Sequence, residues 1–424
     1  MLAIFLTVFV ILLVLGMPIA IALGGTALSY LLLKGESLTL LVQTTFAGMA
    51  SFPLLAIPLF MLAGALMNEG GITRDLVRFT KLLLGHISGG LGLATILASA
   101  IFAAISGSAV ATAVAIGSVM IPAMRDAGYD EDVSAAVTAT ASCMGPIIPP
   151  SIPFIIYGVI ANLSIGALFL AGIVPGALLG LALMVYMVYV ARRRRYPLEQ
   201  RPSWREVVVG FWRAIPALLM PVIILGGILG GIFTPTEAAG VAVLYAFLVG
   251  TLIYKGITFR RLPTVLLEAG LETAMVMLLL ALSEPFAWVI AVEQIPQKML
   301  EALTLASSNP WVILLLINIA LLLLGVPLEV APALTIVTPI LAPMADKLGL
   351  DPIHLGTIVV FNLVLGLITP PVGAVLFSVC GMSGLSLERL SRAIWPPFLI
   401  SLIVLLLITF FPPLTLFVPK LLLH

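Results

Sequence analysis

The sequence predicts an all-α protein that crosses a membrane many times, and its composition is the first reason. Of the 424 residues, 62% are hydrophobic and only 9% are charged, and the mean hydropathy is +1.25. A soluble domain usually has about 25% charged residues. Runs of about 20 apolar residues recur along the chain, and each is long enough to cross a bilayer as a helix. We therefore expect a polytopic helical membrane protein.

The apolar runs divide the chain into ten expected helices and two expected hairpins. The helices are expected at 2–15, 18–34, 53–69, 131–160, 166–191, 213–232, 235–254, 263–291, 353–382 and 394–416. The hairpins are expected at 89–124 and 309–345. The flanks of the first hairpin carry charges that belong on one side of the membrane, so this segment must enter and leave there.

Lys and Arg are unevenly distributed between the loops, which predicts the orientation. The stretch "ARRRRYPLEQRPSWREVVVGFWR" begins at Ala191 and must be cytoplasmic. In the expected topology the cytoplasmic loops hold all but four of the 20 Lys and Arg residues. The four exceptions are Lys34, Lys298, Lys347 and Lys420. This arrangement places both termini outside the cytoplasm.

A shift of 221 residues aligns the two halves of the chain. Residues 121–175 then match 342–396 without a gap at nine positions, and six of these are Gly or Pro. The repeat therefore preserves the residues that break or turn helices. The two copies run in opposite directions in the expected topology, as in the inverted repeats of many secondary transporters. We expect one repeat at 1–190 and one at 213–424, joined by a basic cytoplasmic linker at 191–212.

Each half contains a Gly four residues before a Pro-Pro pair, inside an apolar run. These positions are Gly145 with Pro149 and Pro150, and Gly366 with Pro370 and Pro371. Proline lacks an N–H and disfavours helix in the residue before it, so both helices are expected to open here. Unwound backbone at this depth must be buried in protein, line a watery cavity or coordinate a ligand. The alternative is a structural kink satisfied by neighbouring helices.

The expected hairpins turn at small or polar residues. Ser106, Gly107 and Ser108 interrupt the first hairpin, and Gly325, Pro327 and Glu329 lie at the corresponding place in the second. Close packing of small residues between helices is the alternative reading of the first tip. Glu329 is expected either to bind a ligand or to cap the helix that follows it, and the sequence does not decide between these roles.

Such tips and breaks suit both a cation and an anion. The helix that follows each tip points its free N–H groups at the membrane centre, which favours an anionic group. Exposed carbonyls, with the hydroxyls of Ser106, Ser108 or Thr369, are hard oxygen donors for Na⁺. Two copies suggest two cation sites around one anion site. Two Na⁺ ions moving with the field could drive a carboxylate uphill.

Few other residues are candidates for binding a ligand, a metal ion or a proton. Glu237 follows Pro235 at a helix start, where a structural role is favoured, and Glu284 is the remaining deep acid. The three histidines are far apart, and Cys143 and Cys380 are expected to be buried apolar residues. No nucleotide-binding loop is present, so an ATP-driven pump is not expected. No catalytic constellation and no nucleic-acid partner are expected either.

Six strings together resemble the large membrane subunit of tripartite ATP-independent periplasmic (TRAP) transporters, in the ion-transporter superfamily. They are "GMPIAIALG" (16–24), "FPLLAIPLFMLAGALMNEGGI" (52–72), "SGSAVATAVAIGSVMIPAM" (106–124), "GPIIPPSIPFIIYG" (145–158), "FTPTEAAGVAVLYA" (233–246) and "GLITPPVGAVLF" (366–377). The resemblance implies Na⁺-driven uptake of an organic acid across the bacterial inner membrane by an elevator motion. C4-dicarboxylates, keto acids and sialic acid are the implied kinds of substrate.

The resemblance also implies partners and site residues. A periplasmic binding protein would deliver the substrate, and a separate small four-helix subunit would complete the complex. By position, one cation site would use Ser106, Ser108, Gly145 and Pro149, and a second would use Gly325, Gly366 and Thr369. The substrate would lie near Gly107, Ser108, Pro150, Ser151, Glu329 and Pro371. The competing readings are a stand-alone Na⁺- or H⁺-coupled carboxylate symporter, a channel and, more weakly, an intramembrane enzyme.

Overall fold

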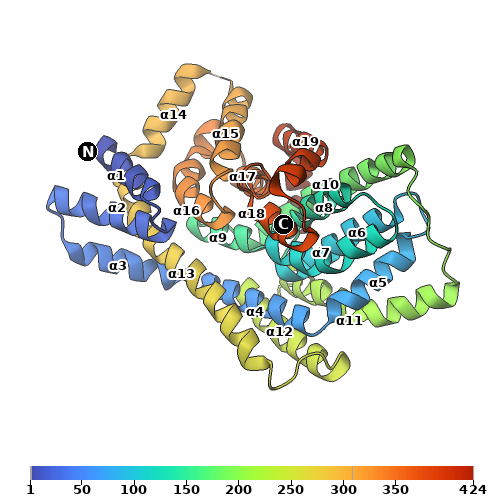
Figure 1. Cartoon of the computed structure of the whole chain (residues 1–424). Coiled ribbons are helices and arrows are strands. Elements are labelled where there is room, and N and C mark those ends of the chain that lie inside the picture. Colours follow the sequence, from blue (N-terminus) through green and yellow to red (C-terminus); the bar gives the residue numbers. More distant parts are fainter. Residues whose placement is uncertain (1, 308, 424) are drawn as a thin grey trace.

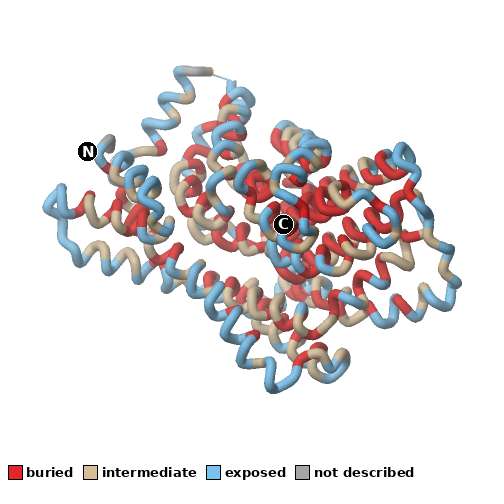
Figure 2. Tube along the Cα trace, viewed as in Figure 1, coloured by how far each residue is buried: buried red, intermediate tan, exposed pale blue. Residues whose placement is uncertain are grey.

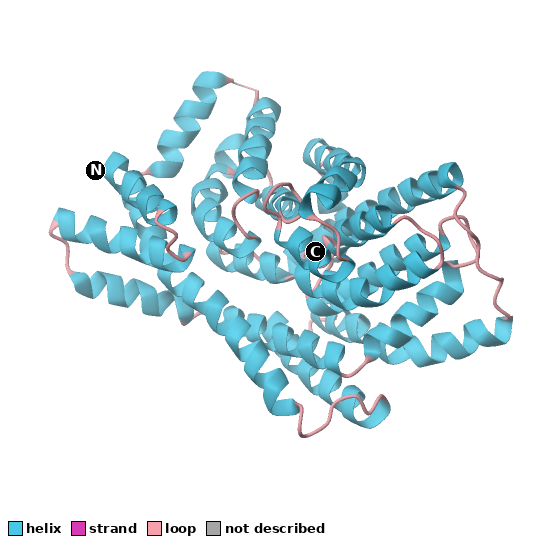
Figure 3. Ribbon diagram, viewed as in Figure 1, coloured by secondary structure: helices cyan, strands magenta, loops and turns pink. Residues whose placement is uncertain are grey.

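A computed structural model describes residues 2–307 and 309–423. Every regular element in these two stretches is helical (Figure 3). The all-α fold class is thus confirmed. Figure 1 shows the order of the helices along the chain.

The first half of the chain runs through ten α-helices and one short 3-10 turn. They are α1 (Leu2–Val14), α2 (Ile19–Lys34), α3 (Leu38–Met49), η1 (Phe52–Leu55), α4 (Ala56–Glu69), α5 (Ile72–Leu84), α6 (Gly90–Ser106), α7 (Ala109–Asp126), α8 (Glu131–Ser142), α9 (Ile152–Ile160) and α10 (Ile165–Arg194). Both expected interruptions are present here. The hairpin turns between α6 and α7, and the broken helix opens between α8 and α9.

The second half repeats this plan. Its α-helices are α11 (Trp204–Leu229), α12 (Pro235–Leu248), α13 (Leu262–Val292), α14 (Ile295–Ala306), α15 (Pro310–Gly325), α16 (Val330–Leu341), α17 (Pro352–Gly366), α18 (Ala374–Ser383), α19 (Leu387–Phe410) and α20 (Pro413–Leu422). A π-helical turn (η2, Val249–Ile253) extends α12. The second hairpin turns between α15 and α16, and the second broken helix opens between α17 and α18.

Some boundaries differ from the expected ones. The range 394–416 is not one helix, because α19 begins at Leu387 and ends at Phe410, before α20. Pro413 starts the new helix, since proline cannot continue the old one without losing a hydrogen bond. The linker 191–212 is mostly helical. Its start belongs to α10 and its end to α11, where Ser203 and Glu206 form a reciprocal capping box.

Three helices were not predicted: α3, α5 and α14. The case of α5 is instructive, because its charges lie on one side while Ile72, Leu76 and Val77 are buried. A search for continuous apolar runs misses such an amphipathic helix.

At least seven helices in the described stretches are long and apolar enough to cross a membrane. They are α4 with η1, α7, α10, α11, α12 with η2, α13 and α19. By contrast, α1 has 13 residues and α2 has 16, which is shorter than the roughly 20 residues of an upright span. These two elements must tilt little or reach only part of the way across the bilayer.

The helices form two groups, which we call the core bundle (α6–α10 and α15–α19) and the frame (α1–α4 and α11–α13). Figure 1 shows the frame as extended arms beside a more compact bundle, and Figure 2 shows burial concentrated in the bundle. Within the frame, α13 packs on α2, α3 and α4, and α12 packs on α4. The two groups meet where α4 contacts α6 and α13 contacts α16.

Candidate functional site

The tip of the first hairpin lies directly against the first helix break. A Cβ atom at Gly145 would lie 2.5 Å from the Ser108 carbonyl oxygen. A Cβ atom at Gly107 would lie 2.8 Å from the Pro150 carbonyl oxygen and 3.4 Å from the Ile152 backbone nitrogen. Only glycine permits this approach, and Gly107 also has a left-handed φ of 62°. The structure therefore brings together the two interruptions that the sequence predicted for this half.

Three oxygen atoms gather at this contact. The hydroxyl of Ser106 lies 2.9 Å from the hydroxyl of Thr112, which donates a 2.7 Å hydrogen bond to the Ser108 carbonyl. Ser106 and Thr112 are buried. The sequence reading missed Thr112, although its place four residues after Ser108 on α7 was a usable signal, because residues i and i+4 share a helix face.

Two helix N-termini also converge here. Ser108 is the N-cap of α7, and its hydroxyl accepts a hydrogen bond from the Ala111 N–H. Ser151 is the N-cap of α9, and its hydroxyl accepts from the Phe154 N–H and donates to the Pro146 carbonyl at 2.5 Å. Helix N-termini carry unpaired N–H groups and partial positive charge. The first site thus combines oxygen donors for a cation with positive helix ends for an anion.

The second tip and break meet in the same way through glycine. A Cβ atom at Gly366 would lie 2.5 Å from the Gly325 carbonyl oxygen. The Thr369 hydroxyl is half-buried and donates to the Leu365 carbonyl at 2.8 Å. Pro371 is exposed, whereas Pro149 and Pro150 in the first break are buried. The second site is therefore more open than the first.

Glu329 lies at the N-cap of α16, at the place that corresponds to Ser108. Its carboxylate is exposed and makes no capping bond to the helix. The carboxylate also makes no ion pair with any residue that the structure describes. The backbone position fits the capping alternative, but the side chain makes no capping bond, and its expected role as a ligand stays a prediction.

A buried amide pair holds the second hairpin against its broken helix. Asn362, one turn before Gly366, donates from Nδ2 to the Asn318 side-chain and backbone oxygens at 2.7 and 3.0 Å. Asn318 on α15 in turn donates to the Thr409 hydroxyl on α19 at 3.2 Å. Asn318 was not singled out from the sequence, because one Asn within a run of leucines gives little signal of its partner.

The two halves exchange their packing partners. α7 of the first hairpin packs on α18 of the second broken helix, and α16 of the second hairpin packs on α9 of the first broken helix. Such reciprocal contacts are those expected of two copies related by a two-fold rotation. They place both sites inside one bundle.

The two other acids considered from the sequence, Glu237 and Glu284, lie on helices of the frame. Glu237 completes a capping box with Thr234 at the start of α12, as the structural reading predicted. Glu284 packs against the backbone of α3, because a Cβ atom at Gly48 would contact its Cγ. Among the described residues, His, Cys, Asp and Glu form no group of three that could hold a metal ion. A cation at the first tip would rely on neutral oxygen atoms, those of Ser106, Ser108 and Thr112.

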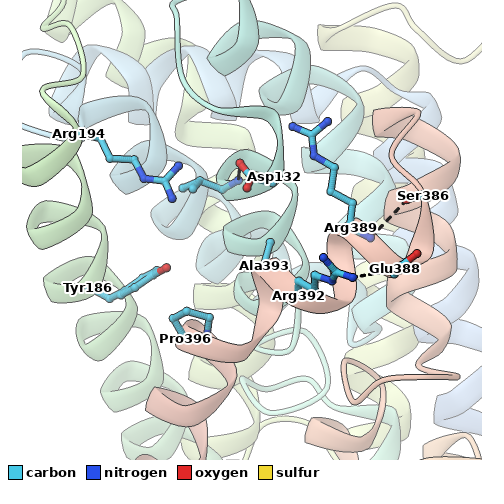
Figure 4. Close-up of a pocket in the computed structure, with 10 residues that line it drawn as sticks. Asp132, Tyr186, Arg194, Ser386, Glu388, Arg389, Arg392, Ala393 and Pro396 are labelled. Carbon is cyan, nitrogen blue, oxygen red and sulfur yellow. Dashed lines mark hydrogen bonds and ion pairs between the residues drawn. The ribbon is translucent and has the colours of Figure 1, made fainter.

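A separate cleft of about 560 Å³ lies at the far end of α8 from its break. Figure 4 shows it between Asp132, Tyr186, Arg194 and the first turns of α19. None of the predicted site residues lines it. Two of its arginines already have acidic partners, since Arg194 pairs with Asp130 and Arg392 with Glu388. Its size therefore does not make it a better candidate than the tips and breaks.

Comparison with known proteins agrees with this arrangement. Residues 6–414 match the family model of the tripartite ATP-independent periplasmic transporter, DctM component. The chain is 42% identical over 407 residues to the sialic acid TRAP transporter large permease protein SiaM of Vibrio cholerae, covering 96% of this chain and 95% of that protein. It is 43% identical over 401 residues to the C4-dicarboxylate TRAP transporter large permease protein DctM of Pseudomonas aeruginosa, covering 95% and 94%.

A solved structure supports the fold. The crystal structure of the Alcanivorax borkumensis YdaH transporter, which has an unusual topology, superposes with a TM-score of 0.64. The superposition covers 89% of this chain and 91% of that chain at 14% sequence identity.

Proposed function

The chain belongs to the family of TRAP transporter large permease subunits, and on this premise we propose that it carries out Na⁺-coupled uptake of an organic acid. The observation that carries the proposal is the contact of each hairpin tip with a helix break at Gly145 and Gly366. This contact places main-chain atoms of the tip against main-chain atoms of the break at two equivalent places inside the bundle.

The first proposed Na⁺ site uses Ser106, Ser108, Gly145 and the backbone at Pro149, and we add Thr112. The grouping of three neutral oxygen atoms supports it, because Na⁺ is a hard cation that prefers such donors. The second proposed site uses Gly325, Gly366 and Thr369. Bulky apolar substitution of Ser106 or Thr369 is expected to weaken the Na⁺ dependence of uptake.

The proposed substrate site lies between the two tips and the two breaks. We assign to it residues at or shortly before the starts of α7, α9, α16 and α18, namely Gly107, Ser108, Pro150, Ser151, Glu329 and Pro371. The positive ends of α7 and α9 support an anionic substrate, and Na⁺ at the proposed sites would favour one as well. The two relatives named above act on sialic acid and C4-dicarboxylates at nearly equal identity. A carboxylate is therefore the proposed class, without a choice among its members.

We further propose that the core bundle moves as a body against the frame, as an elevator. One contact between the two groups, between α4 and the first tip, joins two small residues and so suits sliding. A Cβ atom at Gly64 on α4 would lie 3.4 Å from the Ser106 Cα.

The proposed setting is the bacterial inner membrane with both termini on the periplasmic side. The proposed partners are a small four-helix membrane subunit and a periplasmic binding protein. The test is uptake into proteoliposomes that contain the complex. Uptake that needs Na⁺ and the binding protein supports the proposal. Equal uptake of free substrate without the binding protein would instead support a stand-alone symporter.

A further inference from the structure

A smaller cleft, of about 200 Å³, lies between α5 and α11 and is lined by arginines from both helices. Arg78 comes from α5, and Arg205 and Arg213 come from α11. The two helices pack on each other (Figure 1). They approach closely at Gly210, where a Cβ atom would lie 2.7 Å from the Leu82 Cδ1 atom. We call this place the α5–α11 cleft.

The charge of these arginines is not neutralised within the part of the chain that the structure describes. None of them forms an ion pair with an acid in 2–307 or 309–423. Glu206 also lines the cleft, but its carboxylate already accepts hydrogen bonds from the Ser203 N–H and hydroxyl, at 2.7 and 2.8 Å. In the larger cleft, by contrast, Arg194 and Arg392 have acidic partners. The α5–α11 cleft therefore has an excess of guanidinium groups, which bind phosphate through paired N–H donors.

The α5–α11 cleft lies where α11 leaves the membrane. The apolar part of α11 begins at Ala214, directly after Arg213. Trp204 and Trp212 have exposed fractions of 80% and 68%, and exposed tryptophan is enriched at the boundary between a bilayer and water. Arg205 lies two helical turns before Arg213, about 12 Å along the axis. The arginines therefore lie at the level of lipid headgroups.

Apolar side chains line the same cleft. Leu82 and Val209 belong to its lining, and Val209 is 45% exposed. A free phosphate ion would use only the arginines. A phospholipid would use both parts of the lining, because its phosphate is charged and its acyl chains are apolar. Basic pockets beside membrane helices bind anionic lipid headgroups in this way.

We propose that the α5–α11 cleft binds the headgroup phosphate of an anionic phospholipid, with Arg78, Arg205 and Arg213 as its hydrogen-bond donors. The expected orientation of the chain puts this lipid in the cytoplasmic leaflet. Since α5 joins α4 of the frame to α6 of the core bundle, the lipid lies where the two groups are connected. The inference concerns lipid recognition and does not depend on which ion or substrate is transported.

The test is native mass spectrometry of the full chain in detergent, titrated with phosphatidylglycerol or with phosphatidylcholine. Wild type is expected to bind phosphatidylglycerol about tenfold or more tightly than phosphatidylcholine. An arginine beside an anionic lipid contributes roughly fivefold in affinity. The Arg205→Gln, Arg213→Gln double variant is therefore expected to bind phosphatidylglycerol about tenfold or more weakly, with no change for phosphatidylcholine. Arg78→Gln, on the other wall, should have a smaller effect in the same direction.

The matched control is the Arg192→Gln, Arg260→Gln double variant. It removes the same charge from exposed positions that line neither cleft, and it is expected to bind phosphatidylglycerol like wild type. Equal melting temperatures of the variants show that all are folded.

Three results would overturn the inference. The first is equal affinity for phosphatidylglycerol in wild type, Arg78→Gln and the double variant of the cleft. The second is an equal loss in the control, which would indicate attraction to the basic surface as a whole. The third concerns inorganic phosphate, which in tenfold excess is expected to leave phosphatidylglycerol bound. Displacement by inorganic phosphate would show that the cleft recognises the free ion rather than a lipid.

Discussion

The Cys143 sulfur lies 3.8 Å from the Val364 carbonyl oxygen, and these two residues are 221 positions apart. That separation is the offset of the internal repeat, so each residue contacts its own counterpart. Equivalent residues of two copies touch each other only beside the axis that relates the copies. The two helix breaks therefore lie back to back at the centre of the core bundle, with Gly145 two residues beyond Cys143 and Gly366 two residues beyond Val364.

Alanine at either break glycine is expected to reduce transport by roughly a hundredfold. A Cβ atom at Gly145 or Gly366 would lie 2.5 Å from a carbonyl oxygen of the facing tip, so the backbone must shift. A shift of about 1 Å in a positioned site can reduce its activity by roughly a hundredfold. Uptake into proteoliposomes measures this effect.

Gly381→Ala is the matched control for these variants, because it lies on α18 and a Cβ atom there meets nothing within 4 Å. Wild-type uptake by Gly145→Ala and Gly366→Ala would show that the close contacts are not needed for transport.

Gly64 tests whether the bundle slides on the frame. Gly64→Ala is expected to be tolerated, because its Cβ would be in ordinary contact with Ser106 at 3.4 Å. Gly64→Leu would fill the space between α4 and the tip, so it should slow uptake about tenfold or more while the protein remains folded. Uptake rates and melting temperatures of the two variants make the comparison. Fast uptake by Gly64→Leu would contradict sliding at this contact.

The capping box of α12 is expected to matter for stability alone. Thr234→Ala removes the hydroxyl that accepts from the Glu237 N–H, at a cost of about 1 kcal/mol. Thermal unfolding in detergent should show a lower melting temperature. The Na⁺ concentration for half-maximal uptake should not change. A change would indicate that Glu237 contributes to Na⁺ binding.

Asp130 gives a prediction about pH. Hydrogen bonds from the Tyr196 hydroxyl and from Arg194 hold the pKa of its carboxyl below the usual range. Its contribution to stability is therefore present above the unfolded pKa of about 3.9 and is lost as the pH falls through the lower folded value. Both partners are about half exposed, so the contribution is below about 1 kcal/mol.

Asp130→Asn is accordingly expected to destabilise the protein slightly at pH 7. Its deficit relative to wild type should begin to shrink below about pH 4, where the carboxyl of the unfolded wild type takes up a proton, and vanish once the folded carboxyl is neutral too. A deficit that stays constant down to pH 3 would show that charge at Asp130 is not the cause. Chemical unfolding in detergent at several pH values supplies the comparison.

The sequence predicted those parts of the fold that depend on local backbone chemistry. Pro149 and Pro370 mark where helices must open, and the structure opens both, with the Pro149–Pro150 and Pro370–Pro371 peptide bonds in the cis form. Each hairpin tip lies against the break of its own half, with Gly107 beside Pro150, Ser108 beside Gly145 and Gly325 beside Gly366.

Features that depend on tertiary packing were not predictable from one sequence. Nothing local links Asn318 with Asn362, or α7 with α18, since these pairings are set by how the bundle closes. The contact between Thr112 and Ser106 likewise depends on the turn between α6 and α7, although the spacing of Thr112 from Ser108 could have drawn attention to it. The helix α5 escaped detection because only one of its faces is apolar.

Binding of Na⁺ at the first tip and break is the central claim, and thermal stability measured against Na⁺ concentration tests it most directly. A ligand that binds the folded state stabilises it by about 2.7 kcal/mol at a hundred times its dissociation constant. Na⁺ should therefore raise the melting temperature above that in equal K⁺. The Ser106→Ala, Thr112→Val double variant should show a clearly smaller rise, while Ser118→Ala on the same helix should respond like wild type. An unchanged Na⁺ response in the double variant would contradict the account.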